Sequence, residues 1–153
     1  MDLVLWRHAE AQDWMPGCDD MSRCLTARGE KQAVRMAAWL DRQLPANTRI
    51  FVSPARRCEQ TASALGRKYK FRQELSPEGQ MAQLLELVQW PDAKGTVLVV
   101  GHQPTLGQTI AHLIELKASE CAVKKGAVWW LRHRQRDSLS HSVLVAVQST
   151  ELL

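Results

Sequence analysis

The sequence predicts an α/β protein with a three-layer α/β/α arrangement around a mixed, mostly parallel central sheet. Three short apolar runs carry this prediction: residues 3–6, 50–52 and 96–100. Uninterrupted apolar runs of this length are typical of parallel strands buried on both faces, and the second and third lead directly into a helix start. Two β-rich runs at 126–132 and 141–147 predict an antiparallel pair that completes the sheet.

Helical periodicity predicts four helices. Thr26 is expected to cap the first, at about 27–44, with Glu30 placed favourably for the helix dipole. Pro54 and Pro104 are expected at the first positions of two others. The remaining three helices are predicted at about 54–69, 80–89 and 104–114.

Two connections complete the predicted fold. Residues 71–75 are expected to form a short edge strand. The connection 12–24 is too polar and too broken for a helix, with a turn at Pro16-Gly17. Within it, Trp14 and Met15 are expected to pack onto the domain; the alternative is an exposed apolar rim beside a binding pocket.

Length and composition indicate one domain. The chain has 153 residues, of which 45% are hydrophobic, so it can bury one core and is too short for two ordinary domains. We therefore expect residues 1–153 to form a single domain, and a monomer. No secretory pattern and no bilayer-spanning apolar run occurs, which predicts a cytoplasmic protein without a membrane partner. The four cysteines have neither C-x-x-C nor zinc-ligand spacing, so reduced thiols are expected.

Four residues at the ends of the predicted strands are candidates for a functional site. Arg7 and His8 directly follow the first strand, Arg57 lies near the start of the helix after the second, and His102 follows the third. Because the carboxyl ends of parallel strands meet at one edge, we expect these side chains to lie together. Two imidazoles and two guanidiniums at one place make an anion site. The Arg7-His8 pair alone could equally be a solvated strand end.

Charge and motifs limit the other classes of function. No P-loop, dinucleotide fingerprint, H-E-x-x-H or EF-hand pattern occurs, so no cofactor and no metal is implied. The formal net charge of +4 permits nucleic-acid binding, but the basic residues form no stripe with stacking aromatics, and no nucleic-acid partner is expected. The basic run Arg132–Arg136 is interpreted as a charged turn that protects a sheet edge; the alternative is steering toward an acidic protein.

At these residues the sequence resembles the histidine phosphatase superfamily, and within it the small SixA-type phosphohistidine phosphatases. Four stretches occur in family order: RHAEA at 7–11, RCLTARG at 23–29, SPARRCEQT at 53–61 and GHQP at 101–104. Cys24 stands where the family usually has Pro, and Gly101 where Ser is also common. These departures bear on loop shape more than on chemistry.

The resemblance implies a phosphoglycerate mutase-like fold and a phospho-His8 intermediate that water later hydrolyses. It also implies that Arg23 contacts the phosphate, although Arg23 could instead be a surface arginine paired with a neighbouring Asp. Residues 59–61 are expected only to support the helix start. Cys24, beside Arg23, is the cysteine whose oxidation would bear on the site.

The chemistry can also be built from the residue types without metal. Arg7 and Arg57 can each bind two phosphoryl oxygens through a planar guanidinium. A neutral imidazole is a competent nucleophile, and His8 is the better candidate because it is adjacent to Arg7. His102 is then expected across the phosphoryl group, where its hydrogen bonds strengthen as charge develops.

The substrate class is argued from the leaving group. An alkoxide needs a general acid, whereas an imidazole nitrogen departs more readily. Between residues 58 and 101, Glu78 on a turn is the one candidate acid, and helix capping is its alternative role. We therefore expect a phosphohistidine phosphatase that acts on a histidine phosphotransfer domain or phosphocarrier and releases phosphate. The alternatives are a phosphomonoesterase or mutase for small phosphorylated metabolites, and a module that binds phosphohistidine without turnover.

Overall fold

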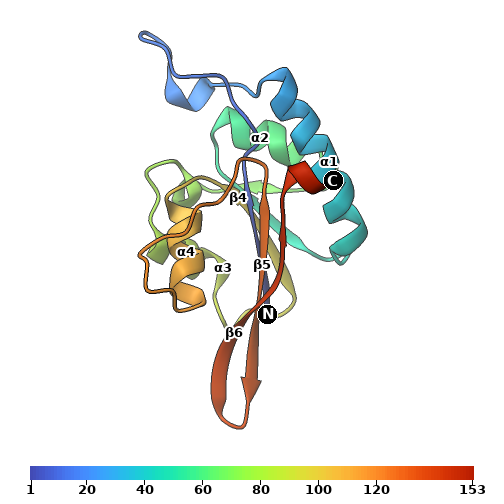
Figure 1. Ribbon diagram of the computed structural model, residues 1–153, viewed down its shortest axis with the longest axis vertical. Helices are drawn as coiled ribbons and strands as arrows, with labels where there is room; N and C mark the ends of the chain where they lie inside the picture. Colours follow the sequence, from blue (N-terminus) through green and yellow to red (C-terminus); the bar gives the residue numbers. More distant parts are fainter.

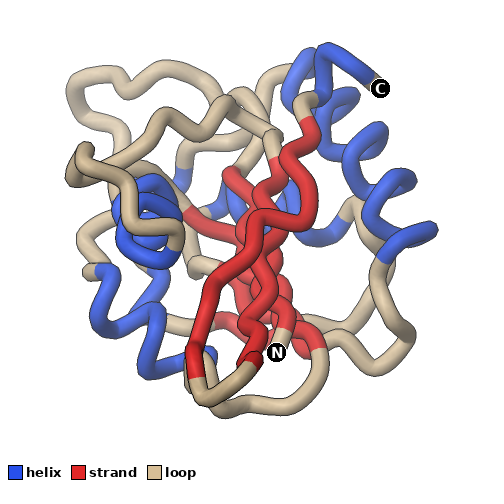
Figure 2. The backbone as a smooth tube through the Cα atoms, turned by 60° about the horizontal axis from the view of Figure 1, so that its bottom comes forward, coloured by secondary structure: helices blue, strands red, loops and turns tan.

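The computed structural model describes residues 1–153 and has the predicted three-layer α/β/α arrangement (Figures 1 and 2). One six-stranded sheet has the order β3-β2-β4-β1-β5-β6. Its strands are β1 (Asp2–Arg7), β2 (Arg49–Val52), β3 (Lys70–Phe71), β4 (Thr96–Gly101), β5 (Val128–Arg136) and β6 (Leu139–Gln148). The helices are α1 (Ala27–Gln43), α2 (Arg56–Ser63), α3 (Met81–Val88) and α4 (Thr105–Leu113). Three 3₁₀ segments also occur: η1 (Asp20–Ser22), η2 (Gln73–Leu75) and η3 (Thr150–Leu152).

The sheet is mixed and mostly parallel. Strands β3, β2, β4 and β1 run parallel to one another, whereas β5 is antiparallel to β1 and β6 is antiparallel to β5. Arg7 at the end of β1 is in register with Gly101 at the end of β4. The residues that follow these two strands therefore emerge side by side at one edge of the sheet.

Each face of the sheet is covered by two helices, and Figure 2 shows helices on either side of the strands. Helices α1 and α2 bury their apolar residues against one face, together with Trp6 and Val100. Helices α3 and α4 pack on the other face, against Leu5 and Val99. Because neighbouring strand residues point to opposite faces, β1 and β4 contribute to both cores and are almost entirely buried.

Helix α1 is held against the chain that follows β1. Thr26 caps the helix as predicted, because its hydroxyl accepts a hydrogen bond from the Gly29 amide at 3.0 Å. A Cβ at Gly29 would collide with the Glu10 carbonyl, so only glycine permits this close packing. The first turn of α1 therefore lies directly against the residues after His8.

Two predicted elements differ from the structure. The second helix was expected at about 54–69, but α2 ends at Ser63 because Gly66 has a φ of +68° and takes the chain out of the helix. The edge strand predicted at 71–75 is wrong except for Phe71, since β3 ends at that residue and residues 73–75 form η2. Pro54 and Pro104 were expected inside the first helical turn, but α2 and α4 begin after them.

The hairpin of β5 and β6 is longer than predicted and turns at Asp137-Ser138, both of which have positive φ. Arg132 is in register with Asp2, so the basic run Arg132–Arg136 lies beyond the amino end of β1. Arg132 donates two hydrogen bonds of 2.7 Å to the Asp2 carboxylate. Figure 1 shows the hairpin projecting at the end of the sheet where the N-terminus lies, which favours the charged-turn interpretation over steering into the site.

No helix is both long and apolar enough to cross a membrane.

Candidate active site

The carboxyl edge of the sheet holds a polar pocket of about 210 Å³. All five candidate residues from the sequence line it: Arg7, His8, Arg23, Arg57 and His102. The rest of the lining is Ala11, Asp13, Pro77, Gln103 and Lys125. The pocket therefore joins the ends of β1 and β4, the start of α2 and the long loop before α1.

His8 is buried and held in one tautomer. Its Nδ1 lies 2.8 Å from the Ala9 carbonyl oxygen, which can only accept, so Nδ1 carries the proton. Burial, followed by the charges of Arg57 and Arg7, lowers the pKa of His8 to about 3, and the bond to Ala9 opposes this shift only partly. Nε2 consequently keeps a lone pair at neutral pH.

His102 faces His8, with the ring centroids 5.2 Å apart. Its Nδ1 lies 3.3 Å from the guanidinium of Arg57, which can only donate, so Nδ1 accepts. Its Nε2 lies 2.8 Å from Ser53 Oγ and carries the proton that Nδ1 lacks. Burial, the neighbouring His8 and Arg57 lower the pKa of His102 to about 3.

The two arginines beside these rings are only partly satisfied. Arg57 is 3% exposed and donates to the Asp20 carbonyl at 2.8 Å and to the Asp20 carboxylate at 3.2 Å. Arg7 donates to the Val123 carbonyl at 2.7 Å, and burial with the nearby Arg57 charge lowers its pKa. The buried Nε atoms of both side chains have no hydrogen-bond partner. Unpaired buried cationic donors are costly, and an anion in the pocket would relieve that cost.

Asp20 is a site residue that the sequence did not single out. It lies in η1 and also accepts a 2.9 Å hydrogen bond from Arg23, so it bridges Arg23 and Arg57. Burial raises its pKa, but the hydrogen bonds from Arg23 and Arg57 outweigh this and the net shift is downward. Arg23 therefore pairs with a neighbouring Asp, as one of its two interpretations expected, and it also lines the pocket. The only signal in the sequence was a carboxylate three residues before Arg23.

The residues that follow Arg57 on α2 make the supporting hydrogen bonds expected of them. Thr61 Oγ1 accepts from the Ala9 amide at 3.1 Å and donates to the Arg57 carbonyl at 2.7 Å. Gln60 accepts a 2.7 Å bond from the Leu25 amide. These bonds tie α2 to the chain on both sides of the pocket.

Four further residues from the sequence analysis lie outside the pocket lining. Glu78 is exposed on its turn, and its neighbour Pro77 contributes to the wall instead. Trp14 and Met15 are 58% and 62% exposed, so the expectation that they pack onto the domain is wrong and the exposed rim is what occurs. Cys24 is half-buried and does not line the pocket.

The cysteines are all reduced, and the structure has no cluster of metal-binding side chains. All four cysteines are free, and burial raises the pKa of the Cys58 thiol to about 12, so it stays protonated beside His102. No three His, Cys, Asp or Glu side chains are grouped so that they could hold a metal ion. The cationic side chains of the pocket are its three arginines and Lys125, and Asp13 is the one carboxylate in its lining.

The two buried imidazoles should make the protein sensitive to acid. Their pKa of about 3 in the folded state lies below the ordinary value near 6.5, so the unfolded chain binds protons first as the pH falls. Stability from this source is complete above pH 6.5 and is lost between pH 6.5 and 3, by about 2 kcal/mol per histidine at pH 5. We expect urea unfolding at pH 8 and pH 5 to show this loss, and His8→Gln to remove about half of it.

The matched control is His141→Gln on the exposed strand β6, which should leave the pH dependence unchanged. An equal loss of stability in the His8→Gln variant and the unsubstituted protein would show that His8 is not buried in its neutral form.

Comparison with known proteins gives the same class of protein as the fold and the site. The sequence profile of the histidine phosphatase superfamily (branch 1) matches residues 3–80. The phosphohistidine phosphatase SixA of Escherichia coli is 31% identical over 121 residues, which are 74% of each chain. An uncharacterized protein of Picosynechococcus is 34% identical over 145 residues, covering 83% of this chain and 87% of the relative. The solved structure of the protein histidine phosphatase SixA with tungstate has a TM-score of 0.77 at 26% identity and covers 99% of both chains.

The chain therefore belongs to the histidine phosphatase superfamily, a class of phosphatases. Within the superfamily it is of the SixA type, since the E. coli and tungstate-bound relatives both match most of its length. A mycobacterial glucosyl-3-phosphoglycerate phosphatase shares the fold with a TM-score of 0.71 at 18% identity.

Proposed function

We propose that this protein is a phosphohistidine phosphatase that dephosphorylates a histidine-phosphorylated signalling or phosphotransfer protein through a phospho-His8 intermediate. The observation that carries the proposal is the pairing of a neutral His8, whose Nε2 is free, with two arginines whose buried Nε donors lack partners. A pocket that holds a nucleophile and guanidinium donors without hydrogen-bond partners is suited to phosphoryl transfer, because those donors can bind the phosphoryl oxygens.

In the first step the lone pair of His8 Nε2 attacks phosphorus. The Nε2–P bond forms while the bond from phosphorus to the substrate's imidazole nitrogen breaks, and that nitrogen takes its electron pair and a proton from water. The Ala9 carbonyl stabilises the positive charge that develops on the His8 ring, because it already accepts the Nδ1 proton at 2.8 Å. In the second step a water oxygen bonds to phosphorus while the Nε2–P bond breaks and its electron pair returns to Nε2. The attacking water loses a proton to the hydroxide left by the first step, phosphate leaves and neutral His8 is restored.

The transferring group carries its charge on three equatorial oxygens. Arg7 and Arg57 face the pocket from β1 and α2, and Arg23 approaches from the loop, so their guanidiniums can hold these oxygens from different sides. Asp20 orients two of the three arginines. His102 donates from Nδ1 once a bound anion has raised its pKa enough for the ring to take up a proton.

The surroundings of the pocket favour a phosphoramidate on a protein over a small phosphoester. Glu78, the one candidate acid, is exposed outside the lining, and an imidazole leaving group needs less help from an acid than an alkoxide does. The loop carrying the exposed Trp14 and Met15 projects from the domain (Figure 1), and its residues Asp13 and Arg23 line the pocket, so it can contact a macromolecule bound there. We further propose that the reaction is metal-independent and cytoplasmic, in keeping with the free thiols.

The proposal is tested by trapping the phosphoenzyme. We expect rapid quench after mixing with a histidine-phosphorylated phosphotransfer domain to give an adduct that adds one phosphoryl group to the intact mass, is labile in acid and is stable in base. In a parallel reaction, p-nitrophenyl phosphate should give much less adduct. An equally abundant adduct from the ester would move the substrate to small metabolites. No adduct with either would favour a module that binds phosphohistidine without turnover.

A further inference from the structure

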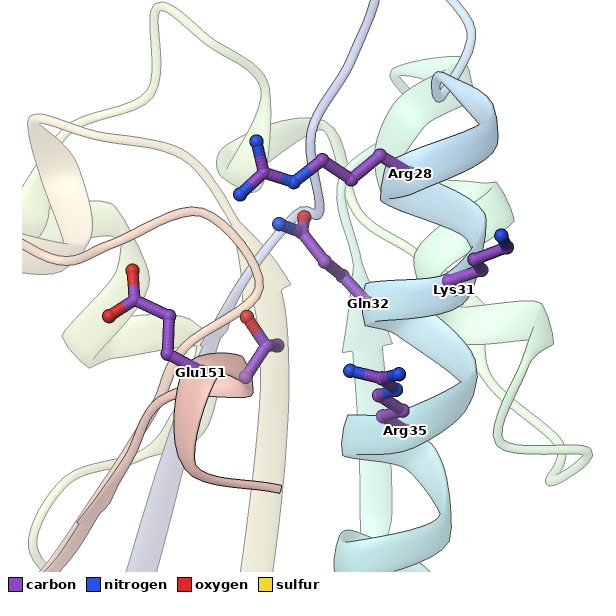
Figure 3. Close-up of a pocket in the computed structure, with 6 residues that line it drawn as sticks. Arg28, Lys31, Gln32, Arg35 and Glu151 are labelled. Atoms are coloured by element: carbon purple, nitrogen blue, oxygen red, sulfur yellow. The ribbon is translucent and has the colours of Figure 1, made fainter.

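A second cleft, of about 280 Å³, lies between α1 and η3. Figure 3 shows Arg28 and Gln32 extending from α1 toward the segment that carries Glu151. We call it the cationic cleft and define it by its lining: Arg28, Lys31, Gln32, Arg35, Thr150 and Glu151. None of these residues lines the catalytic pocket.

The charges of this cleft are not used by the fold. Lys31 and Arg35 are exposed and form no ion pair or hydrogen bond through their side chains, and Arg28 has only Glu10 at 3.7 Å. The single acidic residue of the cleft, Glu151, is already bound to Lys124 at 3.0 Å. The cleft therefore presents two cations, Lys31 and Arg35, that have no partner inside the chain.

The same cations are unfavourable for the helix that carries them. Lys31 and Arg35 are four residues apart, and like charges at that spacing repel on a helix surface. Arg28 also lies in the first turn of α1, where the helix dipole disfavours a cation. Each effect costs only a few tenths of a kcal/mol, but both disappear when an anionic partner occupies the cleft.

A thin wall separates the cationic cleft from the catalytic pocket. Gln32 accepts a 3.0 Å hydrogen bond from the Glu10 amide, two residues after His8. On the other side, a side chain at Gly126 would meet Thr150 and Gln32, while the Gly126 amide donates to the His8 carbonyl at 3.0 Å. The cleft lining therefore contacts the same two chain segments, at Glu10 and Gly126, that hold His8.

We propose that the cationic cleft docks an acidic surface of the phosphorylated substrate protein and so presents its phosphohistidine to His8. This inference rests on the proposed function and adds to it where the substrate is held. The three cations are exposed at the ends of long side chains, and no buried unpaired donor lies among them. Such an arrangement suits several carboxylates on a protein surface better than one enclosed small anion, and it accelerates association through charge.

The test is the double charge reversal Lys31→Glu/Arg35→Glu. At low salt we expect kcat/KM for a histidine-phosphorylated phosphotransfer domain with an acidic surface to fall about tenfold, and this difference to shrink as salt screens the charges. The kcat/KM for p-nitrophenyl phosphate should stay unchanged, because neither residue lines the catalytic pocket. Poly-glutamate should inhibit turnover of the phosphoprotein by the unsubstituted enzyme and not by the variant.

The matched control is Lys94→Glu/Lys117→Glu, which makes the same change in net charge at two exposed lysines that form no ion pair and lie outside both clefts. Equal losses in the two double variants would overturn the proposal in favour of net-charge steering. Inhibition by duplex DNA but not by poly-glutamate would overturn it in favour of a nucleic-acid surface. Unchanged phosphoprotein turnover in the cleft variant would overturn docking and leave the proposed function standing. If the unsubstituted enzyme does not dephosphorylate the phosphoprotein, both the docking proposal and the proposed function are wrong.

Discussion

The His8→Ala variant should lose turnover almost completely, with kcat reduced by about 10⁴-fold or more on a phosphoprotein and on p-nitrophenyl phosphate alike. The reason is that the proposed reaction passes through a bond to His8 Nε2, and no other side chain in the pocket offers a comparable lone pair. His102 Nδ1 already accepts from Arg57, and the Cys58 thiol is held protonated by burial. Steady-state rates and the intact mass after rapid quench measure this directly.

The His8→Ala result needs a control for loss of a histidine as such. His112→Ala, at an exposed position on α4, should keep full activity. His8→Ala should still bind inorganic phosphate by calorimetry, since the arginines remain. Residual turnover within tenfold of the unsubstituted enzyme would exclude His8 as the nucleophile, whatever the variant's stability.

The second large effect is expected for Arg57→Lys, which keeps the charge and removes the planar guanidinium. We expect kcat/KM for p-nitrophenyl phosphate to fall by about 10²- to 10³-fold. Arg57 donates to the backbone carbonyl of Asp20, to the carboxylate of Asp20 and to His102 Nδ1. A single ammonium group cannot hold these three partners and a phosphoryl oxygen together. Phosphate affinity should fall as well, because the free Nε donor is lost.

Arg67→Lys is the matched control for Arg57→Lys, since Arg67 is an arginine bound to a carboxylate and to backbone carbonyls away from the pocket. It should leave kcat/KM unchanged. Thermal unfolding with and without phosphate separates a folding defect from a binding defect: the Arg57→Lys protein should remain folded and lose the stabilisation by phosphate. Activity within threefold of the unsubstituted enzyme would show that the planar guanidinium is not needed.

Much of the sheet and of the pocket could be predicted because both depend on local sequence. The apolar runs at β1 and β4 are continuous because both faces are buried, and Thr26 has the side chain that a helix start requires. His8 and His102 directly follow those strands, so parallel pairing alone brings them to one edge. The end of α2 was missed because the sequence pattern was taken as helical past Gly66. The positive φ of Gly66, which takes the chain out of the helix, cannot be read from that pattern.

Other features depend on contacts between segments far apart in the chain. Asp20 lies 37 residues from Arg57, and no spacing in the sequence pairs an acid in a long loop with an arginine on a helix. The same holds for Ser53 and His102, which meet only because β2 lies beside β4. The exposure of Trp14 and Met15 was decided by how the loop folds back onto Arg23, and not by their hydrophobicity.

By itself, then, the sequence determined the class of fold, the order along the chain of the helices and of all strands but β3, and the identity of the arginines and histidines that meet at the sheet edge. Strand burial, helix caps and the residue after a strand are written in runs of a few neighbouring residues. Only the tertiary structure decided the tautomers of His8 and His102, the bridge made by Asp20 and the cationic cleft beside the pocket. Each of these depends on burial or on the distance between distant segments, and those quantities exist only once the chain has folded.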